Sequence, residues 1–375
     1  MKVEPAMDVT GVTLPLPSIN VQRFRAIRHL SLPELARVTL FVGQNNAGKT
    51  SLLEAVRLFS AANPLSVLAT VLRERSGIRF SPARRLSATL DVAVEDLEAA
   101  VAAARSIFHG TYSGAEDTVQ IDGPRERLVL SLPWSSRISK DDRGRLVELE
   151  LFLGPSSPLI QIDRGARKWE LTYDLLMRRR SVVVRRGAMP AVFIPAQGMS
   201  GAAIASFWDR VADDGYAADV EEVLRTMVPG LERVYLVGAG GSQLRTVALQ
   251  IRGLRRLVPI ANMGDGTNRV FAVALALVSA REGLVLIDEV ENGLHHSVQD
   301  QVWTAIFSLA AQMGTQVLAT THSWDTVVGF QSAANRYAAA GLLYRLEQET
   351  DGSIYVERYT QHEVGIAAEQ QIEVR

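Results

Sequence analysis

The stretch with the clearest chemical meaning is Gly43–Thr50, which reads GQNNAGKT. A short β-branched and aromatic run, Val38–Val42, leads into it, and apolar residues at helical spacing follow it. Two glycines, a lysine and a hydroxyl residue at these positions, between a strand and a helix, form the pattern of a phosphate-binding loop. The sequence therefore predicts a nucleoside triphosphate site. An ordinary glycine turn with a surface lysine is the weaker alternative.

Each residue type in this loop suits a triphosphate. Gly43 and Gly48 allow the backbone N–H groups to turn inward around a phosphate, and the helix that follows contributes its free N-terminal donors. Lys49 supplies positive charge for the β- and γ-phosphates, and the Thr50 hydroxyl is a hard-oxygen ligand for Mg²⁺. The residues predicted to contact ATP are Gly43, Gln44, Asn45, Asn46, Ala47, Gly48, Lys49, Thr50 and Ser51.

Two acids follow a second apolar run, Leu284–Ile287. At the end of such a strand, Asp288 can hold Mg²⁺, directly or through water, and Glu289 can orient or deprotonate the attacking water. Side chains alternate in direction along a strand, which suits two separate roles. A strand that ends in Asp-Glu is common, but beside a phosphate-binding loop the pair indicates metal-assisted hydrolysis.

A third apolar run, Gln316–Thr320, is followed by a threonine and His322. At a neighbouring strand end, an imidazole can donate a hydrogen bond to the γ-phosphate or to the water, so His322 joins Glu289 and Lys49 as a catalytic candidate. A core or helix-capping histidine is the main alternative. A hydrolase that uses Ser323 is disfavoured, because no nucleophile elbow surrounds this serine.

Several other residues carry weaker signals. Gly264 and Gly266 lie in a turn that opens a helix, where free N–H groups can bind an anion, although a simple turn with an N-cap is equally compatible. His295 and His296 with Glu291 could suggest a metal site, but adjacent histidines point in different directions on a helix. Arginine clusters could contact a phosphate backbone or lie on solvated faces. These clusters are Arg178–Arg180 with Arg185–Arg186, and Arg252 with Arg255–Arg256.

The 375 residues carry a net charge of −1, and 47% of them are hydrophobic and 22% charged. This balance is typical of a globular protein and provides no overall field to hold the molecule on nucleic acid, so any DNA contact needs a local patch. The absence of cysteine excludes disulfides and thiolate catalysis and is compatible with a reducing cytosol. We recognise no signal peptide and no run long enough to span a membrane, so we expect a cytoplasmic protein.

Strands that alternate with helices around these motifs predict an α/β P-loop NTPase fold with a mainly parallel, doubly wound sheet. Near the N-terminus we expect two strands, Asn20–Ile27 and Arg37–Val42, around a turn at Leu30–Leu35. A final hairpin is predicted at Leu342–Glu347 and Ser353–Thr360.

The domain boundaries follow from changes in pattern. We expect a flexible tail at residues 1–18 and an ATPase core made of residues 19–64 and 191–375. Between the two halves of the core, residues 65–190 carry short β-like runs separated by turns, which predict an inserted α+β lobe. Further strands are expected at Leu86–Val94 in this lobe and at Val182–Arg186 at its end.

Four segments together resemble an ABC-type ATPase head of the RecF/SMC/OLD group. Within that group the chain is most similar to the stand-alone AAA-family ATPases of bacterial defence systems. The segments read FVGQNNAGKTSLLEAV, GDGTNR, VLIDEVENGLHH and ATTHS, and they lie within residues 20–335 with a lobe inserted as in that group.

The resemblance implies roles for the motif residues. Gly43–Thr50 becomes the Walker A loop, Asp288 the Walker B carboxylate, Glu289 the catalytic glutamate and His322 the switch histidine. Residues 291–295 take the D-loop position and residues 264–269 the signature loop. A glutamine that contacts the metal is also expected after the first lobe's sheet, and we assign Gln197 to this role.

In such heads two subunits enclose two ATP molecules, so the resemblance implies a homo-oligomer that is at least an ATP-sandwich dimer. Each signature loop contacts the γ-phosphate on its partner. Here Met263 stands where a serine is usual, so this contact would depend on the backbone N–H groups of Gly264 and Gly266. No long coiled coil interrupts the head, and the residues after Ser332 are too few for the Toprim nuclease domain of OLD proteins.

The resulting functional hypothesis is a Mg²⁺-dependent ATPase whose ATP-driven dimerisation regulates a partner effector protein, in bacterial anti-phage defence. One alternative is a RecF-like DNA-repair ATPase that binds DNA, although the net charge does not indicate nucleic acid. Another is a slowly hydrolysing, ATP-gated scaffold that sequesters an effector. No membrane partner is expected.

Overall fold

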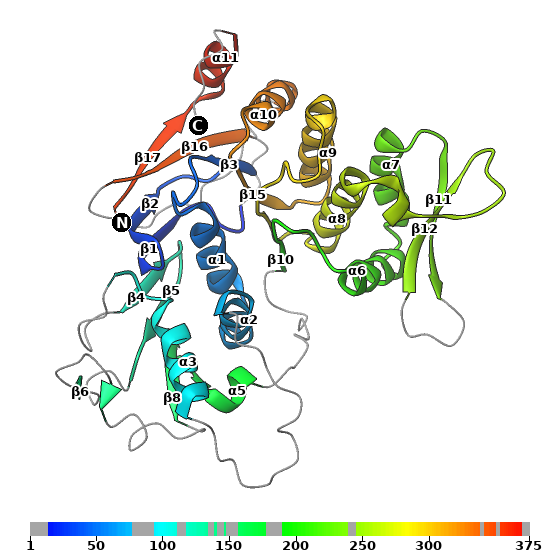
Figure 1. Cartoon of the computed structure of the whole chain (residues 1–375). Coiled ribbons are helices and arrows are strands. Elements are labelled where there is room, and N and C mark those ends of the chain that lie inside the picture. Colours follow the sequence, from blue (N-terminus) through cyan, green and yellow to red (C-terminus); the bar gives the residue numbers. More distant parts are fainter. Residues whose placement is uncertain are drawn as a thin grey trace.

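The computed structural model describes residues 14–76, 94–110, 118–133, 139–140, 146–147, 157–177, 190–238, 245–337, 341–349 and 353–369. Figure 1 shows their arrangement. Several expectations lie outside these residues. They are the strands Leu86–Val94 and Val182–Arg186, the arginines at 178–180 and 185–186, and the first thirteen residues of the predicted tail.

A six-stranded sheet lies at the centre of the fold, in the order β10-β14-β15-β3-β16-β17. Every neighbouring pair is parallel except β16 and β17, which confirms the predicted mainly parallel α/β sheet. The strands are β10 (Ala191–Ile194), β14 (Leu284–Ile287), β15 (Gln316–Thr321), β3 (Val38–Val42), β16 (Gly341–Gln348) and β17 (Ile354–Tyr359).

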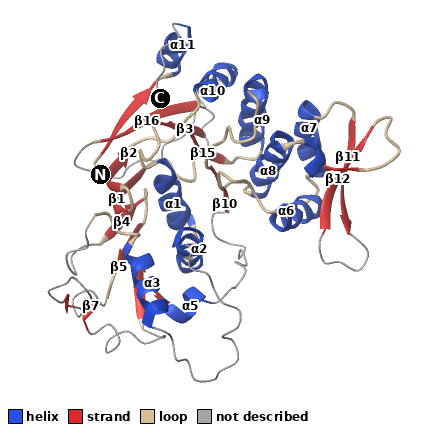
Figure 2. Cartoon of the chain, in the orientation of Figure 1, coloured by secondary structure: helices blue, strands red, loops and turns tan. Residues whose placement is uncertain are grey.

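Two hydrophobic cores cover the two faces of this sheet. Along β3, Phe41 packs into the core on the α1 side, whereas Val38, Leu40 and Val42 pack into the core beneath helices α8–α10. Figure 2 shows the strands between these two groups of helices. Because both faces are buried, the strands are almost continuously apolar, as is usual for parallel sheets covered by helices.

Helices pack around the two sheets in both halves of the chain. In the C-terminal half they are α6 (Gly201–Asp213), α7 (Ala217–Met227), α8 (Asp265–Ser279), α9 (Gln299–Gln312), α10 (Trp324–Arg336) and α11 (Gln361–Glu369). In the N-terminal half they are α1 (Lys49–Ser60), α2 (Pro64–Ser76), α3 (Val94–Arg105) and α5 (Tyr173–Met177). No helix among the described residues is long and apolar enough to cross a bilayer.

A second, antiparallel sheet has the order β2-β1-β4-β5-β8-β9. Its strands are β1 (Ile19–Phe24), β2 (Ile27–Leu32), β4 (Val119–Asp122), β5 (Arg127–Ser131), β8 (Pro158–Arg164) and β9 (Arg167–Thr172). The turn expected at Leu30–Leu35 was wrong, because β2 continues to Leu32. Adjacent polar residues Arg28 and His29 interrupt the alternation that would have revealed this strand.

This second sheet joins the two parts of the chain that the sequence separates. Strand β1, from the predicted core, pairs directly with β4, from the predicted lobe, with Val21 opposite Ile121. The division into core and inserted lobe remains a prediction, but the lobe's strands extend a sheet that begins in the core.

Two smaller sheets complete the described structure. One contains β11 (Leu231–Gly238), β12 (Arg245–Ile251) and β13 (Val258–Pro259), and the other contains β6 (Ser139–Lys140) and β7 (Leu146–Val147). The predicted final hairpin is present as β16 and β17, and its first strand also pairs in parallel with β3. The hairpin therefore closes one edge of the central sheet.

Candidate active site

The loop between β3 and α1 has the backbone that a phosphate-binding loop requires. Gly43, Asn46 and Gly48 all have positive φ, at 150°, 68° and 86°. A Cβ atom on Gly43 would overlap the carbonyl oxygen of Leu346 on β16, so the glycine allows two backbones to approach closely. Gly48 ends the turn directly before α1, and α1 begins at Lys49. The loop amides therefore lie at the N-terminus of a buried helix, where an anion is stabilised.

Lys49 folds back over this loop. Its Nζ donates to the carbonyl oxygens of Gly43 and Gln44 at 2.7 and 2.8 Å, and the residue is 8% exposed. Burial lowers the pKa of Lys49, and the carboxylates of Glu291, Asp288 and Glu289 partly oppose this effect. An anion bound beside the ammonium would favour its charged form further.

Asp288 follows β14 and lies beside the loop. The Thr50 hydroxyl is 3.1 Å from Asp288 Oδ2, and the Thr320 hydroxyl donates to Asp288 Oδ1 at 2.7 Å. A hydroxyl and a carboxylate next to a phosphate site fit Mg²⁺, which is usually bound by one or two protein oxygens, substrate phosphates and water. No cluster of three acidic, histidine or cysteine side chains that could hold a metal occurs among the described residues.

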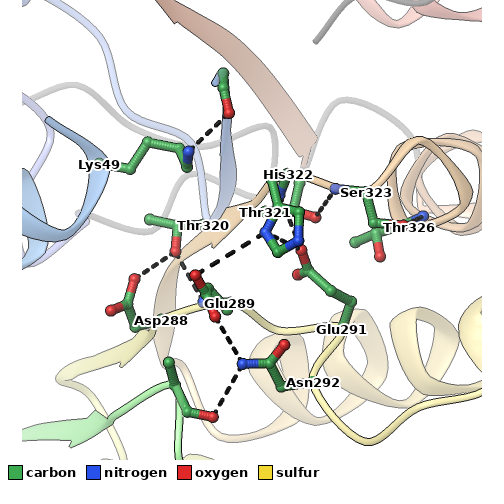
Figure 3. Close-up of polar contacts among 12 residues, drawn as sticks. Lys49, Asp288, Glu289, Glu291, Asn292, Thr320, Thr321, His322, Ser323 and Thr326 are labelled. Atoms are coloured by element: carbon green, nitrogen blue, oxygen red, sulfur yellow. Dashed lines mark hydrogen bonds and ion pairs between the residues drawn. The ribbon is translucent and has the colours of Figure 1, made fainter. Parts of the chain in front are cut away.

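Glu289 is held in a strained backbone conformation at the same strand end. Its φ is 49°, and its N–H donates to the Thr320 hydroxyl at 2.9 Å. One carboxylate oxygen accepts from Asn292 Nδ2 at 2.7 Å, and that amide also donates to the carbonyl of Ala196 (Figure 3). Positive φ in a non-glycine residue is uncommon and persists where neighbours over-determine it. The arrangement fixes the direction of the Glu289 carboxylate.

His322 lies beside this carboxylate but is paired with another acid. Its Nδ1 is 4.0 Å from Glu289 Oε1 and 3.1 Å from Glu291 Oε1, and its backbone N–H donates to Glu291 Oε1 at 2.9 Å (Figure 3). The side chain of Glu291 is only 10% exposed. The resemblance assigned Glu291 to the D-loop but predicted no contact between Glu291 and His322. The sequence signal for this role was the position of Glu291, two residues after Glu289.

Replacing Glu291 with glutamine should therefore reduce turnover through His322. We expect about a tenfold lower kcat with little change in KM, because one oriented group is loosened while the phosphate loop is intact. Steady-state phosphate release measures this effect. Glu222→Gln, at an exposed position on α7, is the matched control. A Glu291→Gln loss that adds fully to the loss in His322→Ala would contradict coupling between the two residues.

Arg269 on α8 binds the backbone just after the ends of β10 and β14. Its guanidinium donates to the carbonyl oxygens of Pro195, Asp288 and Glu289 at 2.8, 2.6 and 2.9 Å. Arg269 is 5% exposed, and burial lowers its pKa while nearby carboxylates oppose this shift. The sequence indicated it only as the last residue of the GDGTNR segment. The structure shows that it fixes the backbone that carries both acids.

Arg269→Leu should therefore destabilise the protein. One buried and two partly buried carbonyl oxygens lose their donor, and we expect a loss of about 3 kcal/mol in the free energy of unfolding. Urea unfolding measures it, with Arg256→Leu as a control because Arg256 is exposed. A stability equal to that of the wild type would show that the three hydrogen bonds are replaceable by water.

A cavity of about 660 Å³ opens over these groups. It brings together most of the predicted loop residues with both acids, and two arginines that the sequence did not single out. Its lining includes Asn45, Asn46, Gly48, Lys49, Thr50, Ser51, Asp288, Glu289, Arg25 and Arg75.

The two arginines share one buried acid. Arg25 Nε lies 2.8 Å from Glu54 Oε2, and Arg75 Nε donates to Glu54 Oε1 at 2.8 Å. Burial raises the pKa of Glu54, and the two guanidinium groups oppose that shift. Arg25 belongs to the turn between β1 and β2, whereas Arg75 lies in the last turn of α2. No local pattern could have placed them on one wall, because their proximity arises from the packing of separate elements.

Of the predicted residues outside the phosphate-binding loop, His322, Gln197, Gly264 and Gly266 do not line this cavity. Gln197 lines a second cavity of about 340 Å³, beside Asn268 and Asn292. Its position gives no support to the predicted metal contact with Thr50 and Asp288. Gly264 and Gly266 lie at the start of α8, where a Cβ on Gly266 would be 2.9 Å from the carbonyl oxygen of Gly293. The turn at residues 264–266 and the loop that contains Gly293 therefore pack against each other within one chain.

Two family models match the two segments of the chain that form this site. A family model described as AAA ATPase domain matches residues 16–108, which include the phosphate-binding loop. A second, described as AAA domain, putative AbiEii toxin, Type IV TA system, matches residues 180–328, which include both acids and His322. Both matched segments are therefore similar to AAA-type ATPase domains, one in each half of the site.

Individual relatives of this ATPase are distant. A Helicobacter pylori protein named ATP/GTP phosphatase is 20% identical over 296 residues, which cover 75% of this chain and 77% of that protein. An uncharacterized Methanocaldococcus jannaschii protein is 42% identical over 60 residues, which are 16% of this chain and 27% of that protein.

Solved SMC heads are also similar to the ATPase. The SMC head bound to the C-winged helix domain of ScpA has 12% identity and a TM-score of 0.49, and the match covers 92% of this chain and 98% of that one. The SMC head domain from Thermotoga maritima has 12% identity and a TM-score of 0.42, with 92% and 99% covered.

Proposed function

We propose that this ATPase uses Mg²⁺ and ATP to form a dimer, and that dimerisation regulates a partner effector protein in anti-phage defence. The observation that carries the proposal is that the first turn of α1 and the ends of β14 and β15 bring five side chains close together. They are Lys49, Thr50, Asp288, Glu289 and His322. These are the groups that phosphoryl transfer to water requires, because such catalysis depends mainly on positioning and charge stabilisation.

Each group has a defined task in this reaction. Thr50 and Asp288 would hold Mg²⁺, which when bound neutralises charge on the phosphates. Lys49, released from the loop carbonyls, binds the β- and γ-phosphate oxygens. Glu289 orients a water molecule for attack on the γ-phosphorus and accepts its proton, while the bond to the bridging oxygen breaks. His322 donates a hydrogen bond to the γ-phosphate.

Dimerisation is supported by the turn that begins α8. Its helix has no side-chain N-cap, so the first amides are free to bind an anion from a second subunit. Asn268 lies in this turn, and its side chain donates to the carbonyl of Gly264. In a sandwich dimer, each ATP would contact the phosphate loop of one subunit and this turn of the other.

A mixing experiment tests the shared site. Lys49→Ala lacks a working phosphate loop, and Asn268→Asp adds a repelling carboxylate to the turn, so each variant alone should be inactive. Random mixing should restore about a quarter of wild-type turnover, because half the dimers are mixed and each mixed dimer has one intact site. No recovery on mixing, with both variants folded by circular dichroism, would contradict a site shared between subunits.

The effector and defence roles are supported by the family description that names a putative AbiEii toxin and by the resemblance of the motifs to defence ATPases. Phage plating on a host that carries the gene with its native neighbours tests them. We expect lower plating with the wild type than with Lys49→Ala. Equal plating of a broad phage panel on both strains would count against a defence role and leave the ATPase assignment unaffected.

A further inference from the structure

The small sheet β11-β12-β13 has one covered face and one open face. Val234, Val247 and Leu249 point into the core beneath α6 and α7. Side chains alternate along a strand, so Arg233, on the neighbouring position of β11, points away from that core and is exposed. Figure 1 shows this sheet beyond α6 and α7, on the side away from α1 and the phosphate-binding loop.

The open side of this sheet and the adjoining loop gather exposed apolar side chains. Tyr235 and Val237 on β11 are 43% and 41% exposed, and Leu254 and Leu257 in the β12–β13 loop are 54% and 41% exposed. These are four of the eight large hydrophobic side chains that are exposed among the described residues, and they occur within 23 positions of the chain. Scattered exposed apolar residues need no explanation, but a concentration of them marks an interaction site.

The same region carries uncompensated positive charge. Arg245 pairs with Asp209, and Arg252 lies 3.6 Å from Glu232. Arg233, Arg255 and Arg256 are exposed and have no acidic or hydrogen-bonding partner within the described part of the chain. We call the set Arg233, Tyr235, Val237 and Leu254–Leu257 the basic apolar patch.

We propose that the basic apolar patch docks an acidic segment of a partner protein that carries apolar anchor residues. Unpaired guanidinium groups would attract carboxylates, and Tyr235, Leu254 and Leu257 would receive apolar side chains. Tyrosine and arginine are enriched in protein–protein interfaces. A DNA backbone would require the charges but would gain little from exposed leucine and valine, which makes a protein the better match. The inference specifies the partner of the proposed function, and it does not depend on hydrolysis.

A selection from a random peptide display library tests this surface on the full-length protein. We expect enriched peptides with net negative charge and at least one large apolar residue. Their affinity should fall at least tenfold in the Arg255→Glu/Arg256→Glu variant and in the Leu254→Ser/Leu257→Ser variant. The matched control is Arg167→Glu/Lys168→Glu, an exposed basic pair on β9, which should bind the peptides normally.

Three results would overturn the proposal. One is the absence of any peptide whose binding depends on the patch. The second is that the wild type binds a short DNA duplex and that the Arg255→Glu/Arg256→Glu variant loses this DNA binding but still binds the peptides. This result would assign the patch to nucleic acid. The third is nucleotide-independent self-association that the same variant abolishes, which would assign the patch to a second copy of the chain.

ATP turnover of both patch variants is measured in parallel and should equal that of the wild type. If the wild-type protein binds the peptides but does not hydrolyse ATP, the proposed function is refuted and the docking surface is still supported.

Discussion

Lys49→Ala should abolish detectable ATP binding. The buried ammonium donates to the loop carbonyl oxygens of Gly43 and Gln44, and bound phosphates would replace these acceptors. Charge-assisted hydrogen bonds to two phosphates contribute about 3 kcal/mol or more, and each 1.4 kcal/mol is about a tenfold change, so affinity should fall at least about 100-fold.

Titration calorimetry with ATP and Mg²⁺ measures this loss. Lys168→Ala is the matched control, because Lys168 is an exposed lysine paired with Asp163 on the other sheet. Circular dichroism should show that Lys49→Ala retains its secondary structure, since alanine is well tolerated in the first turn of a helix. Normal ATP affinity in the folded Lys49→Ala protein would refute the role given to the phosphate-binding loop.

Glu289→Gln should separate binding from hydrolysis. Glutamine has nearly the shape of glutamate and can still accept from Asn292, so the strand end and the phosphate loop should keep their geometry. It cannot accept the proton of the attacking water, and we expect kcat to fall by about 10²- to 10⁴-fold while ATP affinity changes little. The variant should therefore accumulate with ATP bound and should remain dimeric.

Phosphate release and light scattering with ATP measure these two effects together. With ADP in place of ATP the variant should be monomeric, so the ADP sample is the control for ATP-dependent dimerisation. Equal turnover of wild type and variant, with an ATP-dependent change in assembly size, would favour the slowly hydrolysing scaffold over the regulated ATPase.

The candidate catalytic motifs can be recognised in the sequence because each depends on residue types at fixed spacing within one short segment. The turn Gly43–Thr50 needs its glycines, lysine and threonine at fixed spacing, and the apolar strand before Asp288 identifies itself by composition. Parallel strands present their carboxyl ends at one edge, so the ends of β14 and β15 had to lie together once both were recognised as strands. The meeting of Asp288, Glu289 and His322 follows from that rule.

Pairings between distant segments could not be predicted in this way. The sequence contains no sign that β1 pairs with β4, that Arg25 and Arg75 share Glu54, or that Arg269 binds the carbonyls behind both acids. Gln197 was assigned from its position after a strand, yet the fold places it in the second cavity.

The sequence by itself determined the chemistry: a triphosphate loop, two acids and an imidazole on a mainly parallel sheet. Only the tertiary structure decided which side chains hold those groups in place and which surfaces are left open, including the basic apolar patch. The physical reason is that residue spacing encodes backbone periodicity over a few turns or strand positions, whereas burial and long-range contacts depend on how the whole chain packs.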